Sequence, residues 1–162
     1  PYKQIDESLD MIMNGKAAMV IPYDQTVLFL SEEQTVASLR ADSILEHLQL
    51  HSASYRRWLG RPSCGGLFFV NREVYLKCGG ENEHFYGWGP EDAERVRRME
   101  ILGYPVGVNT EGPLYHLWHP RGDNSRFFNR QLASNSRLEL IRICNMDIKE
   151  LTDDVASWRN RK

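Results

Sequence analysis

The segment Gly87-Trp88-Gly89-Pro90-Glu91-Asp92 constrains the fold of this chain more than any other. Glycine on both sides of Trp88 lets the backbone bend sharply and expose an indole face. Pro90 suits the first position of a helix, because its missing N–H would have no partner there. The pattern therefore predicts a loop that ends at Pro90 and a helix with two acids in its first turn.

Two interpretations of Glu91 and Asp92 are open. Helix starts favour carboxylates, because unpaired N–H groups and the positive end of the helix dipole stabilise them. The acids can therefore be structural alone. Beside an exposed indole, a carboxylate can instead accept a proton from the hydroxyl of a sugar whose apolar face lies on Trp88. The neighbouring indole leads us to favour the second interpretation.

Size and composition describe an ordinary globular protein of 162 residues, with 41% apolar and 26% charged side chains. We expect residues 1–162 to form a single domain. A formal net charge of −2 gives no electrostatic reason to expect nucleic acid or a membrane as the main partner. No apolar run approaches the roughly 20 residues that cross a bilayer. The sequence therefore predicts no transmembrane segment.

The cysteines are odd in number and form no CxxC pair. Cys64, Cys78 and Cys144 therefore indicate neither a disulfide framework nor a structural zinc site. We expect reduced thiols in a cytoplasmic protein that reaches a membrane only through a longer parent.

Hydrophobic periodicity predicts a mixed α+β domain, with a mixed sheet flanked by helices. Expected helices cover residues 4–14, 31–50, 71–77, 90–102, 125–145 and the segment from 147 onward. Expected strands cover residues 17–21, 27–30, 67–70, 106–108 and 114–118, with 67–70 central in its sheet. Residues 51–63 read as a surface loop. On the helix after Trp88, we expect a solvated charged face made of Arg95, Arg97, Arg98, Glu94 and Glu100.

A histidine pair and a glycine pair add to the candidate site. His116 and His119 end an expected strand, and both imidazoles could reach one ion if the chain bends at Pro120. Two ligands are too few for a divalent cation, and single histidines in strands are usually structural. Gly65-Gly66 either lets a ligand approach the backbone or forms a bulge or tight turn.

Together these motifs resemble the C-terminal galactosyltransferase domain. That domain is shared by β-1,4-galactosyltransferases, bacterial chondroitin-polymerase-type enzymes and, more distantly, polypeptide N-acetylgalactosaminyltransferases. The matching motifs are Cys64-Gly65-Gly66-Leu67-Phe68-Phe69, Gly79-Gly80-Glu81-Asn82, Tyr86-Gly87-Trp88-Gly89-Pro90-Glu91-Asp92 and His116-Leu117-Trp118-His119.

The resemblance implies the acceptor-side half of a GT-A glycosyltransferase. Such an enzyme moves a hexose or N-acetylhexosamine from a UDP-sugar to an acceptor sugar hydroxyl, with a metal ion and with inversion. Carried over by position, Asp92 would be the catalytic base. The other implied site residues are Gly65, Gly66, Asn82, Trp88 and Glu91 for substrate, and His119 and His116 for Mn2+ or another divalent cation.

The chain departs from the family pattern at two positions. Pro90 replaces a glycine common in the animal enzymes. Ser63 is small where a bulky aromatic helps to select galactose, so the choice between galactose and N-acetylgalactosamine stays open.

The family's DxD metal motif is the main missing element, because it normally precedes a helix like the one expected at 4–14. We therefore expect a fragment of a longer glycosyltransferase, with the nucleotide-binding N-terminal half supplied in cis or in trans.

A second hypothesis is a carbohydrate-binding or partner-docking module without turnover. It keeps Trp88 as a sugar platform and treats the histidines as structural. An RNA-binding fold built on Arg56, Arg57, Arg61 and Trp58 is disfavoured, because the net charge is acidic and no RNA-binding signature is present.

Overall fold

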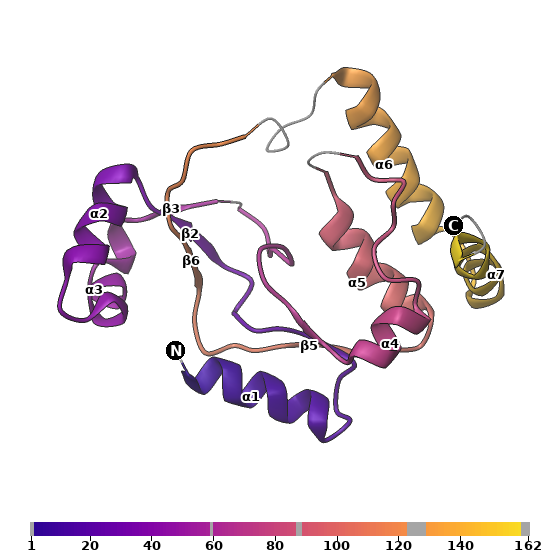
Figure 1. Cartoon of the computed structure of the whole chain (residues 1–162), viewed down its shortest axis with the longest axis horizontal. Helices are drawn as coiled ribbons and strands as arrows, with labels where there is room; N and C mark the ends of the chain where they lie inside the picture. The colour runs from indigo at the N-terminus through magenta and orange to yellow at the C-terminus, as the bar shows by residue number, and fades with distance from the viewer. Residues whose placement is uncertain (1, 59, 87–88, 123–128, 160–162) are drawn as a thin grey trace.

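The computed structural model describes residues 2–58, 60–86, 89–122 and 129–159 (Figure 1). Its helices are α1 (Tyr2–Met13), α2 (Glu32–Arg40), α3 (Ile44–Leu50), α4 (Arg72–Lys77), α5 (Glu91–Ile101), α6 (Arg130–Cys144) and α7 (Ile148–Arg159). Its strands are β1 (Met19–Ile21), β2 (Val27–Phe29), β3 (Arg56–Arg57), β4 (Phe69–Val70), β5 (Val106–Val108) and β6 (Leu114–His116). The mixed α+β class predicted from the sequence is confirmed.

The strands form two small mixed sheets, with orders β4-β1-β5 and β3-β2-β6. In each sheet the central strand is antiparallel to one neighbour and parallel to the other. The first sheet aligns Val20 with Phe69 on β4 and with Gly107 on β5. The second aligns Phe29 with Arg56 on β3 and with His116 on β6.

The two sheets are joined, because the β1–β2 connection runs beside the β5–β6 connection. Asn109 N–H donates to the Ile21 carbonyl at 2.9 Å, and Asp24 N–H donates to the Gly112 carbonyl at 2.9 Å. These bonds continue the backbone hydrogen bonding between the two sheets. They fix the position of β6, the strand that ends at His116, relative to β1.

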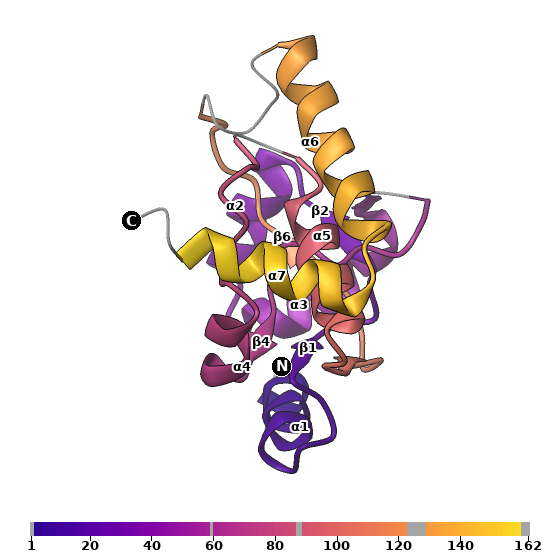
Figure 2. The ribbon, with the colours of Figure 1, turned by 90° about the vertical axis from the view of Figure 1, so that its right-hand side faces the viewer.

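Helices cover the sheets in separate groups (Figures 1 and 2). α4 and α5 pack on the first sheet around the buried residues Met19, Cys78 and Met99. α2 and α3 lie together beside the second sheet, where Leu48 packs against Leu30. α6 and α7 lie on the outer side of α5, so α5 is held between the first sheet and the C-terminal helices.

Capping side chains define several helix starts as the sequence predicts. At α2, the Ser31 hydroxyl accepts from Gln34 N–H while the Gln34 amide accepts from Ser31 N–H. Asn71 caps α4. At α7, Asp147 and Glu150 accept each other's backbone N–H at 2.8 and 2.9 Å. α6 begins after Asn129, whose side chain accepts from Leu132 N–H at 2.9 Å; the expected start at Ser125 lies outside the described residues.

Three expectations differ from the structure. The helix predicted over 31–50 is two helices, because Ala41 is extended and the Ser43 hydroxyl caps a new start. The predicted loop 51–63 contains β3, which pairs with β2. The strand predicted over 67–70 is an edge strand, because β1 occupies the centre of that sheet. Both latter errors concern long-range pairing, which local composition does not encode.

Two further features of the structure concern membrane-spanning segments and the cysteines. No helix in the described part of the chain is long and apolar enough to cross a membrane. The three cysteines are free thiols, with Cys78 buried, Cys64 half-buried and Cys144 exposed.

Candidate functional site

The candidate site is built where α5 begins beside the segment before β4. A Cβ atom added at Gly65 would meet the Asp92 carboxylate, whose Cγ lies 3.1 Å from that position. On the other side, the Tyr23 hydroxyl donates a hydrogen bond to the Gly65 carbonyl. Gly65 is therefore held between the β1–β2 connection and the first turn of α5. The structure brings together Gly65 and Asp92, two of the residues that the sequence nominates.

Gly66 extends this contact toward the histidines. Its φ of +95° favours glycine, and an added Cβ would lie 2.8 Å from the Leu114 side chain. Leu114 begins β6, the strand that carries His116. The glycine pair thus lies between Asp92 on α5 and the histidine strand, with close packing on both sides.

Arg95 is the direct charged partner of Asp92. Its NH1 donates to Asp92 Oδ1 at 2.8 Å, and its Nε and NH2 donate to the two oxygens of Glu81 at 2.7 and 2.8 Å. The guanidinium carbon lies 4.3 Å from the centre of the Phe68 ring. Burial alone would lower the pKa of Arg95, but the hydrogen bonds to Glu81 and Asp92 outweigh it and raise the pKa.

Glu81 is itself held in place. The Tyr75 hydroxyl donates to Glu81 Oε1 at 2.6 Å. Burial alone would raise the pKa of Glu81, whereas the hydrogen bonds from Arg95 and Tyr75 lower it. Burial and the hydrogen bond to Glu81 raise the pKa of Tyr75 to about 12. An ionised Glu81 and a neutral Tyr75 therefore fix Arg95 on the side away from Asp92.

The prediction of a solvated charged face on α5 is wrong for three of its five residues. Arg95 is 5% exposed, Glu94 1% and Arg98 0%. Arg98 pairs with Glu94 at 2.8 Å and also donates to the carbonyls of Cys78 and Gly80. Only Arg97 and Glu100 form the exposed pair expected of such a helix. The carbonyls of Cys78 and Gly80 and the carboxylate of Glu81 come from another segment, so helical spacing does not reveal them as partners.

Glu91 and Asp92 face different surroundings although they are consecutive. Glu91 Oε2 lies near Gly89, whose Cβ position is also 3.4 Å from Ser136 on α6. Glu91 Oε2 is buried without a hydrogen-bond partner in the described structure. Burial, with a contribution from Asp92, raises the pKa of Glu91. Trp88, the predicted sugar platform, lies outside the described residues together with Gly87.

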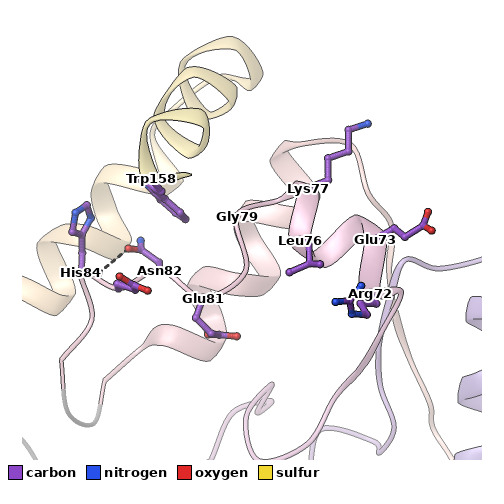
Figure 3. A pocket seen from close by; sticks show the side chains of 10 residues that line it. Arg72, Glu73, Leu76, Lys77, Gly79, Glu81, Asn82, His84 and Trp158 are labelled. Atoms are coloured by element: carbon purple, nitrogen blue, oxygen red, sulfur yellow. Dashed lines mark hydrogen bonds between the residues drawn. The ribbon is translucent and has the colours of Figure 1, made fainter. Parts of the chain in front are cut away.

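Asn82 was predicted to bind substrate, but protein partners occupy its side chain. It is 5% exposed, donates to Glu139 at 2.8 Å, and accepts from His84 N–H at 3.0 Å. Asn82 also lines a groove of about 790 Å³ between α4 and α7 (Figure 3). Glu81, His84 and Trp158 line the same groove, whereas Asp92 does not.

The histidine pair is brought together at the end of β6. The ring centres of His116 and His119 are 5.3 Å apart. His116 stacks on Phe29 at 4.2 Å, and its Nδ1 is buried without a hydrogen-bond partner in the described structure. Burial and the neighbouring His119 lower the pKa of His116, which favours the neutral imidazole that binds metal ions.

These features fit two ligands of a divalent cation. The orphaned Nδ1 of His116 is the kind of buried acceptor that an ion would satisfy. Within the described ranges, no cluster of three or more His, Cys, Asp or Glu side chains is placed to hold an ion. Any further ligand would therefore come from substrate or from residues outside those ranges.

A stack of aromatic rings lies beside the histidines, and it was not predicted from the sequence. Phe29 lies between His116 and Trp58, with its ring centre 4.6 Å from that of Trp58. The guanidinium of Arg56 lies 5.4 Å from the Phe29 and Trp58 ring centres, and that of Arg121 lies 5.8 Å from Trp58. The β2–β3 pairing, which the sequence did not predict, brings these residues together.

Comparison with known proteins finds a similarity in this region. Residues 46–120 match the family model described as the N-terminal domain of galactosyltransferase. The matched segment contains both Gly65 and Asp92, as well as both histidines. This part of the chain resembles a galactosyltransferase domain.

Curated relatives show a similarity of the same kind. The chain is 34% identical over 61 residues to beta-1,4-galactosyltransferase 7 from Mus musculus and from Homo sapiens, covering 35% of this chain and 19% of each relative. It is 28% identical over 82 residues to beta-1,4-galactosyltransferase 7 from Drosophila melanogaster, covering 45% of this chain and 26% of the relative. The match thus spans about a fifth to a quarter of the relatives' length. The search of solved structures found no match to this chain.

The finer parts of the resemblance stay predictions. The family description refers to an N-terminal domain, so the expected position in a C-terminal half is not confirmed. The similarity to chondroitin-polymerase-type enzymes is likewise unconfirmed. Neither the match nor the relatives test the roles of single residues.

Proposed function

We propose that this chain supplies the acceptor side of a glycosyltransferase. The enzyme would move a hexose or N-acetylhexosamine from a UDP-sugar to a hydroxyl of an acceptor glycan. One observation carries the proposal: the Asp92 carboxylate lies against the Gly65 backbone inside the segment that matches a galactosyltransferase family. The Asp92 side chain is partly exposed, and glycine at position 65 has no side chain that would displace its carboxylate.

Asp92 is the proposed catalytic base. Its side chain is 34% exposed, and no described residue donates a hydrogen bond to Oδ2. In an inverting displacement, the acceptor oxygen bonds to the anomeric carbon as the bond from that carbon to the diphosphate breaks. The acceptor proton passes to Asp92 Oδ2. A base of ordinary acidity suffices, because the hydroxyl becomes strongly acidic as its new bond forms.

His119 and His116 are the proposed metal ligands of this chain. When bound there, Mn2+ or another divalent cation would neutralise charge on the departing diphosphate. The stack on Phe29 would fix the plane of the His116 imidazole before the ion arrives. The remaining ligands are proposed to come from the N-terminal half of the parent enzyme and from the donor.

A non-catalytic carbohydrate-binding module is the second candidate. The observation that favours it is the incomplete ligand set, because the described residues provide two imidazoles and no third ligand. In that case the sugar would bind without an ion and without release of a nucleotide.

The experiment that separates the two candidates uses the full-length parent protein. Purified protein is incubated with UDP-galactose or UDP-N-acetylgalactosamine, with and without Mn2+, in the presence of a panel of monosaccharide acceptors. Release of UDP that requires both Mn2+ and an acceptor supports the transferase. Sugar binding that is independent of Mn2+, with no UDP released under any condition, supports the module and contradicts the transferase.

A further inference from the structure

Arg95 connects the Asp92 carboxylate to two groups that lie farther from the candidate site. One arm of its guanidinium donates to Asp92 Oδ1, while the opposite edge donates to both oxygens of Glu81. We infer that Arg95 is a positioning residue, which holds Asp92 so that Oδ2 is the oxygen presented toward Gly65. This inference rests on the proposed role of Asp92 as the base.

The geometry restricts Arg95 from several directions. Glu81 binds it in a two-point fork, which fixes the plane of the guanidinium as well as its position. Phe68 lies under the flat face of that plane at 4.3 Å. Tyr75 in turn holds Glu81. Because Arg95 is buried and already held by these groups, it loses little further conformational entropy when it bonds to Asp92.

The two oxygens of Asp92 consequently differ. Oδ1 accepts the hydrogen bond from Arg95, whereas Oδ2 is the atom nearest to the Cβ position of Gly65. Without Arg95, the Asp92 side chain would be free to rotate about its Cα–Cβ and Cβ–Cγ bonds, and the carboxylate could turn away from the Gly65 backbone. With Arg95 in place, one oxygen is held and the other faces the glycine backbone.

Charged and titratable groups from several elements surround Asp92. Arg95 and Glu91 come from α5 itself. Tyr23 and Cys64 come from the β1–β2 connection and from the segment before β4. Arg95 is the one group in this set that contributes a positive charge. Cys64 is half-buried, and burial is the main reason that the pKa of its thiol is raised. Asp92 raises that pKa further, whereas Arg95 lowers it.

Cys64 therefore reports on the contact between Arg95 and Asp92 without any substrate. In the full-length protein, iodoacetamide alkylation of each cysteine is followed by mass spectrometry at pH 8. We expect Asp92→Asn to speed Cys64 alkylation about threefold, the effect of one nearby charge that solvent largely screens. In an Arg95→Met background, we expect Asp92→Asn to change the rate less than about 1.5-fold, because the carboxylate has turned away.

Matched controls accompany this cycle. Arg97→Met removes a cation from the same helix, where Arg97 pairs only with exposed Glu100, and should leave the effect of Asp92→Asn on Cys64 unchanged. Exposed Cys144 reports general changes in reagent access. If Arg95→Met does not fold, Glu81→Gln replaces it, because it releases Arg95 from its fork while keeping the cation. That variant should reduce the effect of Asp92→Asn on Cys64 to about half.

The kinetic test measures UDP release from UDP-galactose with Mn2+ and an accepted sugar. We expect Arg95→Met to lower kcat at least tenfold with less than a twofold change in the donor KM. Arg95→Lys should recover part of kcat, since lysine keeps the charge but cannot bond both carboxylates in a fork.

The outcomes distinguish the positioning role of Arg95 from the role of Asp92 as the base. Additive effects of Asp92→Asn and Arg95→Met on Cys64, or an unchanged kcat in Arg95→Met, would overturn the positioning role while leaving Asp92 as the base. Coupled effects on Cys64 together with full turnover in Asp92→Asn would instead overturn the role of Asp92 as the base. A purely structural arginine would lower stability without a selective loss of kcat at an unchanged donor KM, and that result also contradicts the inference.

Discussion

The Asp92 carboxylate lies at the place where any residue other than glycine at position 65 would put its Cβ atom. The two residues belong to different elements, one in the segment before β4 and one in the first turn of α5. Their contact is fixed by the Tyr23 hydroxyl on one side and by Arg95 on the other. The absence of a side chain at Gly65 is thus a requirement of the site itself.

Gly65→Ala should impair activity more than stability. The added methyl group must displace the Asp92 carboxylate, and a shift of about 1 Å in a reacting group can cost about 100-fold in rate. We expect kcat for UDP release to fall by about that factor. Gly60→Ala is the matched control, because nothing lies within 4 Å of its added Cβ. Comparable activity of the two alanine variants would contradict the account.

The ion pair between Arg98 and Glu94 should dominate the stability of α5. Both side chains are buried, at 0% and 1% exposure. Arg98→Met leaves Glu94 charged and unpaired, which typically costs about 3–5 kcal/mol in the free energy of unfolding. Urea denaturation of the full-length protein measures this loss.

Two variants control that measurement. Arg97→Met on the exposed face of the same helix should change the free energy of unfolding by less than about 0.5 kcal/mol. Glu94→Leu combined with Arg98→Met should recover part of the loss. The recovery stays incomplete because the carbonyls of Cys78 and Gly80 lose their donor. A double variant less stable than Arg98→Met alone would argue against an unpaired Glu94 as the cause.

Glu139 should make the stability of the C-terminal helices depend on pH. Burial alone would raise its pKa, but hydrogen bonds from Arg142, Asn82 and His84 lower it to about 2, from an ordinary value of 4.5. A lowered pKa adds stability that is fully present above about pH 4.5 and is lost as pH falls toward 2. The contribution is up to about 3 kcal/mol.

Unfolding measured between pH 6 and pH 2 tests this effect. Glu139→Gln should be less stable than the wild type at pH 6, and the difference should shrink as the pH approaches 2. Glu100→Gln, at an exposed pair, should follow the wild-type pH dependence. A constant difference between Glu139→Gln and wild type across this range would count against the lowered pKa.

The histidine pair should determine the response to metal. In the full-length protein, His119→Ala should raise the Mn2+ concentration for half-maximal UDP release at least tenfold, because an imidazole ligand is lost. His116→Ala should do the same and also disturb the stack on Phe29. His47→Ala on α3 is the control, since His47 contacts His51 and lies outside the pair. An unchanged Mn2+ titration in both His116→Ala and His119→Ala would exclude them as ligands.

Local chemistry made much of the fold predictable. Ser31 with Gln34, Asn71, and Asp147 with Glu150 each cap a helix through residues within a few positions. Such signals are contained in the sequence window itself. The same holds for Asp92, whose place in the first turn of a helix follows from Pro90 and the preceding glycine.

The parts that the sequence did not reveal depend on distant partners. Helical spacing put Arg95 on a solvated face, but Glu81 and Phe68 reach it from other segments and bury it. The pairing of β3 with β2 likewise sets Trp58 on Phe29. The sequence contained one indication of the role of Arg95. Arg95 lies three positions after the candidate base Asp92, and Glu81, an acid without a predicted role, lies in the preceding loop.

The most direct test of the account is the Asp92→Asn substitution in the full-length protein. Asparagine keeps the size of the side chain but cannot take up the proton of an acceptor hydroxyl. We predict that UDP release from UDP-galactose with Mn2+ and an accepted sugar falls at least 1,000-fold in kcat, within the range typical of losing general base catalysis. Binding of UDP-galactose, measured by calorimetry, should change less than about threefold. Turnover close to that of the wild type would contradict the assignment of Asp92 as the base.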